Sequence, residues 1–167
     1  RTISPIDGSV LADALSAWDF NYGDLEHVAF PTTDGYVGEI AFVPAPDHAI
    51  HLVSFDLAGW FRVDRPITVL RLLDAAGNIL FDFAANGPIT IQGDGNGPQH
   101  SSFSPDFYHV GVLRLQWGTD WDVGLDNLRF EGVHFTAIPE PSTTALLVLG
   151  GVSLVLVHLR SRRTRRH

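Results

Sequence analysis

The sequence predicts an all-β protein, an antiparallel β-sandwich of the jelly-roll type, with a single transmembrane helix at its C-terminal end. Short stretches of alternating apolar and polar residues recur from residue 39 onwards, separated by turn signals about every 8–12 residues. Before residue 139, no long amphipathic pattern predicts a helix, which favours two packed sheets. Near the end of the chain the alternation gives way to an uninterrupted apolar run, residues 145–157.

The strands are expected mainly after residue 38. Residues 11–15 fit one or two helical turns, whereas Trp18 and Phe20 alternate as in a strand, and residues 31–35 predict a turn. The side chains expected to share a face within each later strand are Ile40 with Phe42, Val53 with Phe55 and Leu57, Ile79 with Phe81 and Phe83, and Leu113 with Leu115 and Trp117. Residues 67–83 predict a hairpin, residues 93–98 a loop and residues 123–130 the last strand.

The composition excludes some classes of function. Residues 1–138 carry six arginines and 18 Asp and Glu residues, a formal charge of −12, and the chain has no lysine. A body this acidic repels nucleic-acid phosphates and favours divalent cations as partners. The chain has no cysteine, which excludes disulfides and thiolate chemistry.

The C-terminal apolar run is suited to a membrane. Residues 143–159 contain one ionisable side chain, His158. A helix of these 17 residues would be about 25 Å long, slightly short of a hydrocarbon core about 30 Å thick. Thinning of the bilayer or snorkelling arginines can make up the difference.

Five arginines follow: Arg160, Arg162, Arg163, Arg165 and Arg166. By the positive-inside rule they stay cytoplasmic, which places residues 1–138 outside the cytoplasm. The alternative, a buried core helix, does not account for this basic end.

Three features of residues 139–167 occur in order: the motif Pro139, Glu140 and Pro141, the apolar run, and the basic tail. This arrangement resembles the PEP-CTERM sorting signal of exported proteins of Gram-negative bacteria. The resemblance implies cleavage near the motif by an exosortase, so that an inner-membrane-anchored precursor becomes a cell-surface or extracellular-matrix protein. It divides the chain into an exported domain, residues 1–138, and a sorting signal, residues 139–167. An exported protein needs a signal peptide, but no apolar core of that kind precedes the first polar residues, so we expect a processed or incomplete N-terminus.

The body also shows a resemblance. Residues 53–60, 74–80 and 123–130 resemble the bodies of other PEP-CTERM proteins, which look like carbohydrate-binding-module jelly rolls. The resemblance covers roughly residues 39–131 and is clearest at Asp126 and Asn127. It implies a domain that binds polysaccharide or serves as a matrix or surface component. Two alternatives stay open: a hydrolase of extracellular polysaccharide, and a structural surface module without a ligand.

Asp126 is the candidate metal ligand. Strict alternation places it on the face of Leu128 and Phe130, where a carboxylate is costly unless it is paired or binds a cation. In the modules that the body resembles, an Asp of the final strand is often a ligand of structural Ca²⁺, which makes Asp126 a calcium candidate. Glu39 is the second candidate, with Asp7, Asp19 and Asp24 as alternatives to it. Otherwise Asp126 accepts backbone N–H bonds or pairs with an arginine.

Aromatic rings at strand ends or in loops are the candidate sugar platforms, and they are Trp60, Trp117 and Trp121. The alternative is that such rings seal the end of the core. His48 and His51 lack the second pair that a zinc site requires. No nucleophile elbow, phosphate loop or Ser-His-Asp arrangement stands out, so no catalytic residue is predicted. The hydrolase alternative would draw its acids from residues such as Asp106 or Asp120.

Overall fold

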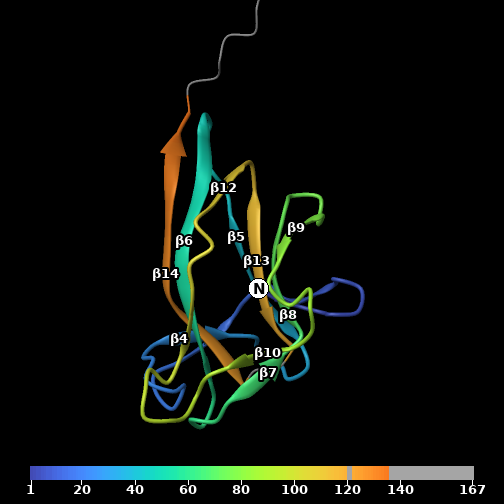
Figure 1. The fold of residues 1–167 in the computed structure, drawn as a ribbon. Coiled ribbons are helices and arrows are strands. Elements are labelled where there is room, and N and C mark those ends of the chain that lie inside the picture. Colours follow the sequence, from blue (N-terminus) through green and yellow to red (C-terminus); the bar gives the residue numbers. More distant parts are fainter. Residues whose placement is uncertain (120–121, 136–167) are drawn as a thin grey trace, which may run out of the picture. The chain divides into compact units, whose positions relative to one another are not determined.

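The computed structural model describes residues 1–119 and 122–135, which belong to one compact unit, Arg1–Phe135. These residues form strands and no helix, as the sequence predicts (Figure 1). The strands are β1 (Thr2–Ile3), β2 (Val10–Ala12), β3 (Ser16–Trp18), β4 (Val28–Phe30), β5 (Val37–Phe42), β6 (His48–Gly59), β7 (Arg65–Ile67), β8 (Val69–Leu73), β9 (Ile79–Asp82), β10 (Ile89–Ile91), β11 (Ser101–Phe103), β12 (Phe107–Val110), β13 (Leu113–Gly118) and β14 (Val123–His134).

None of the described residues belongs to a helix long and apolar enough to cross a membrane. The predicted transmembrane segment, residues 143–159, and the rest of the predicted sorting signal lie outside the described residues. The boundary expected at residue 138 lies outside them as well.

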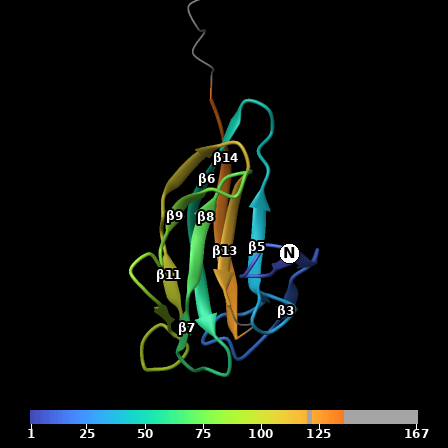
Figure 2. The same ribbon diagram turned by 90° about the vertical axis from the view of Figure 1, so that its right-hand side faces the viewer.

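The strands form two antiparallel sheets that face each other, which supports the predicted all-β class (Figures 1 and 2). Sheet A has the strand order β2-β1-β5-β13-β8-β9. Sheet B has the order β11-β6-β14-β4-β3, and β12 also pairs with the long strand β6. A separate two-stranded sheet joins β7 to β10. The expected hairpin is present, because β8 pairs with β9 across a turn in which Asn78 bonds Asp74.

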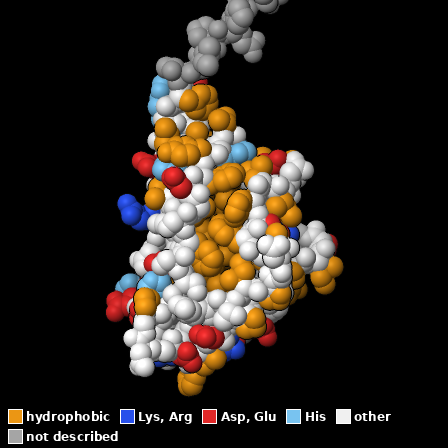
Figure 3. Space-filling model, in the orientation of Figure 1, with side chains coloured by type: hydrophobic (Ala, Val, Ile, Leu, Met, Phe, Trp, Pro, Cys, Tyr) orange, Lys and Arg blue, Asp and Glu red, His pale blue; other side chains and the backbone are white. Residues whose placement is uncertain are grey.

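One hydrophobic core lies between the two sheets. Leu113, Leu115 and Trp117 of β13 are all fully buried in it, as their alternation predicts. Sheet B contributes the side chains of Leu52, Phe55, Leu57, Val123 and Leu125. Figure 3 shows hydrophobic side chains gathered between the edge strands of the two sheets. The rings of Phe103, Phe83 and Phe81 make successive edge-to-face contacts. Apolar burial of this extent is a major contribution to the stability of this unit.

A bulge in β14 decides where Asp126 points. Asp126 pairs with Asp56 and Arg129 pairs with Ser54, so β14 contains one extra residue between these pairs. Asn127 absorbs it with a φ of 50°. Leu125 lies in the core, and successive strand residues face opposite ways, so Asp126 points away from the core. The face predicted for Asp126 by strict alternation is therefore wrong, because alternation holds only in a regular strand.

A second irregularity shifts the register of β6. Arg129 pairs with Ser54 but Phe130 pairs with Leu52, which leaves Val53 as the extra residue. Leu52 is therefore fully buried, whereas Val53 is half-buried. The expected shared face is confirmed for Phe55 and Leu57, which are both fully buried, and is not confirmed for Val53.

The N-terminal region extends both sheets. β1 and β2 lengthen sheet A next to β5, and β3 and β4 lengthen sheet B next to β14. The helical turns considered for residues 11–15 are absent, since β2 ends at Ala12 and β3 begins at Ser16. The strand interpretation of Trp18 is confirmed.

Candidate functional site

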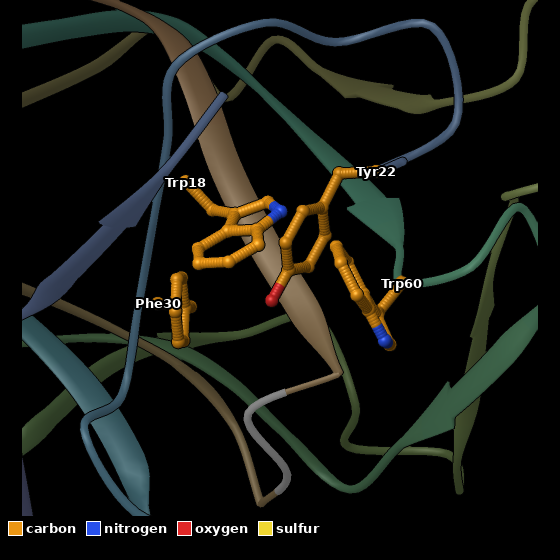
Figure 4. A pocket seen from close by; sticks show the side chains of 4 residues that line it. All are labelled: Trp18, Tyr22, Phe30 and Trp60. Atoms are coloured by element: carbon orange, nitrogen blue, oxygen red, sulfur yellow. The ribbon is translucent and has the colours of Figure 1, made fainter. Parts of the chain in front are cut away.

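Four aromatic side chains line a pocket of about 200 Å³ (Figure 4). They are Trp18 at the end of β3, Tyr22 in the following loop, Phe30 at the end of β4 and Trp60 directly after β6. The pocket lies on the outer face of sheet B. Leu57 of β6 belongs to the main core, whereas its neighbour Ala58 belongs to the cluster that includes Tyr22.

The hairpin of β3 and β4 supplies three of the four rings. Ser16 pairs with Phe30 and Trp18 with Val28, so Trp18 and Phe30 are diagonal neighbours on one face. Tyr22 forms a bridge with Trp60 and thereby connects the hairpin to the end of β6. Gly124 lets the hairpin approach β14, because a Cβ there would lie 2.7 Å from the Cβ of Val28.

The rings differ in exposure, which gives the pocket a floor and an open wall. Tyr22 is 1% exposed, and its ring lies 5.0 Å from that of Trp60 and 5.7 Å from that of Phe30, centroid to centroid. Trp18 is 42% exposed and meets the ring of Trp60 edge-on at 5.8 Å. Phe61 beside the pocket is 69% exposed. Large exposed rings around a buried tyrosine form a surface that can bind the apolar face of a ligand.

The backbone around the pocket adopts an uncommon conformation. Phe61 and Arg62 have φ values of 62° and 53°, and Asn21 beside Tyr22 has a φ of 67°. The N–H group of Arg62 donates to the carbonyl oxygen of Asn21 at 3.2 Å, which joins the two segments. Bulky residues at positive φ cost about 1–2 kcal/mol each. The surrounding contacts hold this strained backbone in place, so the rings are oriented before any ligand binds.

Charged groups surround the aromatic floor. The N–H group of Trp60 donates to the carbonyl oxygen of Asp122 at 2.6 Å, and the Asp122 carboxylate pairs with Arg65 at 2.8 Å. Burial raises the pKa of Asp122, and Arg65 opposes that effect. A hydrogen bond from the imidazole to Asp19 raises the pKa of His27. These contacts involve residues close to Trp18 and Trp60.

Burial alone would raise the pKa of the Asp24 carboxyl, but hydrogen bonds from His100 and from the backbone of Gln99 outweigh burial and lower it. The Asp24–His100 contact is 2.7 Å long. Asp24 therefore stays ionised in the loop that also carries Tyr22.

The predicted ring residues have different positions. Trp60 lines the pocket. Trp117 is fully buried, and its indole N–H donates to the carbonyl oxygen of Val123 at 3.3 Å. It leaves no ring face for a ligand and fits the alternative that such rings seal the core. Trp121 lies outside the described residues.

Sequence reasoning missed three lining residues, which are Trp18, Tyr22 and Phe30. Trp18, Phe20 and Tyr22 are spaced by two, a pattern that places aromatic rings on one side of an extended chain, and this is a signal for Trp18 and Tyr22 but not for Phe30. The partner ring of Trp60 comes from a segment about 40 residues away, and spacing along the chain does not show that contact.

The two candidate calcium ligands lie in different sheets. Glu39 belongs to β5 in sheet A and is buried, and its carboxylate accepts bonds from the Arg1 guanidinium at 2.6 Å and the Gln116 amide at 2.7 Å. Asp126 belongs to β14 in sheet B and accepts the backbone N–H of Asn127 at 2.7 Å. Within residues 1–119 and 122–135, no three His, Asp or Glu side chains are arranged to hold a metal ion. The described residues therefore do not supply a calcium site that joins Glu39 to Asp126.

Calcium binding stays a prediction that thermal melting can test. Calcium that binds only the folded chain would stabilise it by about 2.7 kcal/mol at a hundredfold excess over Kd, a rise of roughly 10 °C in Tm. EDTA should reverse the rise and Asp126→Ala should abolish it. If Asp126 acts only through its bond to Asn127, the substitution lowers Tm and neither protein responds to calcium.

A second cluster of ionisable groups lies on β6. The imidazole of His51 bonds Asp106 at 2.6 Å through Nε2 and Glu131 at 3.1 Å through Nδ1. Its ring stacks on Tyr108 with centroids 3.9 Å apart. The hydrogen bond to Asp106 and then the bond to Glu131 raise the pKa of His51 against the effect of burial. Two carboxylates around one imidazolium tie β12 and β14 to the central strand.

This cluster predicts a pH dependence of stability. Because the folded-state pKa of His51 is raised, its contribution is fully present below the ordinary imidazole pKa of about 6.5 and is lost as pH rises through the folded-state value. The Tm difference between wild type and His51→Gln should be largest in mild acid and shrink in mild alkali. Melting curves across this range decide the matter, and a difference independent of pH would contradict it.

No catalytic assignment follows from these groups. Asp106, named among the acids for a hydrolase, is bonded to His51, and Asp120 lies outside the described residues.

Comparison of the chain with models of protein families, with curated proteins and with solved structures finds no significant match. The aromatic pocket remains a candidate site for a ligand.

Proposed function

We propose that the chain is an exported cell-envelope or matrix protein whose β-sandwich binds polysaccharide in the pocket of Trp18, Tyr22, Phe30 and Trp60. The observation that carries the proposal is the pocket itself, with four aromatic rings and the exposed wall of Trp18. Sugar rings have an apolar face of C–H groups and a polar rim of hydroxyls. Such a ligand stacks on aromatic rings while its rim stays in water.

The destination of the protein is part of the proposal. The motif Pro139-Glu140-Pro141, the apolar run and the five arginines support sorting by the PEP-CTERM route, with an exosortase as processing partner and the inner membrane as the first anchor. The finer fold, a jelly roll like that of carbohydrate-binding modules, belongs to the proposal too. It agrees with the two antiparallel sheets.

Binding and turnover by the full chain in mild detergent test the proposal. Trp18→Ala removes the exposed wall and should weaken binding of a polysaccharide ligand about tenfold, equivalent to about 1.4 kcal/mol. Phe81→Ala is the matched control, since Phe81 is 47% exposed on β9 of the other sheet, and it should leave binding unchanged. Equal loss in both variants would contradict the assignment of the pocket.

The same assay separates the alternatives from binding alone. Release of reducing ends from the polymer would identify a hydrolase instead. Failure of the wild-type chain to bind any glycan on an array would favour a structural surface module.

A further inference from the structure

Two histidines lie opposite each other at one end of the long ribbon formed by β6 and β14 (Figure 1). His48 begins β6, His134 ends β14, and the register of the two strands pairs them directly. The backbone N–H of Phe135 donates to the carbonyl oxygen of Asp47 at 2.9 Å. That bond flanks the two histidines, so they form a non-hydrogen-bonded pair, in which the Cα atoms are only about 4.5 Å apart. An antiparallel sheet brings two side chains closest together at such a pair.

The separation of the two imidazoles matches that of two ligands on one metal ion. Their ring centroids are 5.2 Å apart, and their planes are nearly perpendicular at 86°. Imidazole nitrogens bind a metal ion at about 2.0–2.1 Å, so two imidazoles on one tetrahedral ion have centroids about 5 Å apart. The backbone therefore already holds the rings at the distance that a shared ion requires.

A hydrogen bond orients the ring of His48. Its Nδ1 atom lies 2.8 Å from the carbonyl oxygen of Pro46. A carbonyl oxygen only accepts hydrogen bonds, so the neutral ring carries its proton on Nδ1 and its lone pair on Nε2. Metal-binding histidines are usually oriented by such a bond from the second ring nitrogen. Nε2 of His48 is therefore the ligand atom.

The surroundings of the pair are open. His134 is exposed and His48 is half-buried. Gly132 lies two residues before His134 on the same face and has no side chain, and a Cβ added there would lie 3.6 Å from Cδ2 of His48. Among residues 1–119 and 122–135, no third His, Asp or Glu joins the pair as a metal ligand. Water would fill the remaining positions, which makes the site an open one rather than a closed structural one.

We propose that His48 and His134 together bind a divalent transition-metal ion, with Cu²⁺ bound more tightly than Ni²⁺ or Zn²⁺. Imidazole nitrogen suits these three ions, and their affinities for a given nitrogen site follow this preference for copper. Calcium takes oxygen ligands instead, so this site is separate from the calcium site considered for Asp126. It is also independent of polysaccharide binding in the aromatic pocket.

Copper titration of the full chain in mild detergent, followed by electron paramagnetic resonance, tests the proposal. The chain has eight histidines, so the test compares variants rather than total copper uptake. His48→Gln and His134→Gln should each weaken the tightest copper site at least about tenfold, the loss that even an indirect partner of a metal ligand causes. The wild-type spectrum should show two nitrogen ligands on that ion, and excess calcium should not displace it.

His27→Asn is the matched control. His27 is an exposed histidine outside the pair, just before β4, and Asn tolerates its φ of 60°. This variant should retain the tightest copper site. An equal loss in the control would show diffuse binding to scattered histidines, and full copper affinity in both pair variants would leave only a contact between two rings. Either result, or a single nitrogen ligand in the wild-type spectrum, would overturn the proposal.

Discussion

Replacement of Trp117 by alanine is expected to lower the free energy of unfolding by about 3–5 kcal/mol, the usual cost of removing a large ring from a core. Trp117 is fully buried on β13 and packs over Gly38 of β5, where an added Cβ would lie 2.6 Å from its ring. Its indole N–H also bonds the carbonyl oxygen of Val123 at the start of β14. The substitution therefore leaves a cavity and a carbonyl oxygen without its donor, and Tm should fall by roughly 10–20 °C.

Trp18→Ala is the matched control for this loss of stability. The same substitution at Trp18, whose side chain is 42% exposed, should lower the free energy of unfolding much less. Water can fill part of the space that the exposed ring leaves. Denaturant unfolding of the two variants gives the comparison. A Trp117→Ala protein as stable as wild type, but defective in ligand binding, would contradict the structural role of this ring.

If residues 139–167 act as the proposed sorting signal, Glu140→Ala is expected to abolish its processing. The substitution alters the Pro139-Glu140-Pro141 motif that the exosortase would recognise and leaves the apolar run and the five arginines unchanged. The precursor should therefore stay in the membrane fraction at its full mass. Cell fractionation followed by mass measurement of the product gives the result.

A conservative change within residues 1–138 provides the control for sorting. Asp47→Asn leaves the motif intact and should be processed like wild type. Normal processing of Glu140→Ala would contradict a role for this motif in sorting. That result would not depend on which ligand residues 1–138 bind.

The alternation of apolar and polar residues predicts where the strands of this chain lie better than it predicts which face of a strand each side chain occupies. Leu113, Leu115 and Trp117 are placed correctly in the core because β13 has no irregularity. Asp126 is placed on the wrong face because Asn127 adds a residue to β14. Asn tolerates the positive φ of this bulge, but an Asn in a strand pattern does not by itself predict a bulge. Register shifts of this kind depend on pairing with a distant strand.

The candidate site depends even more on contacts between distant segments. Trp60 was identified as a ring beside a loop, but its partners Trp18 and Tyr22 reach it only because β3 and β4 join sheet B beside β14. Glu39 illustrates the converse. In the sequence its carboxylate is a candidate metal ligand. In the structure this carboxylate is bonded to Arg1 and Gln116.

The most direct test of the central claim is a crystal structure of the protein with a bound oligosaccharide that it has been shown to retain. The account predicts a sugar ring stacked on Trp18, with Trp60 and Phe30 beside it and the buried ring of Tyr22 beneath. A sugar bound away from these four rings, for instance at Phe81 on β9 or at Tyr108 on β12, would contradict the assignment of this pocket as the binding site.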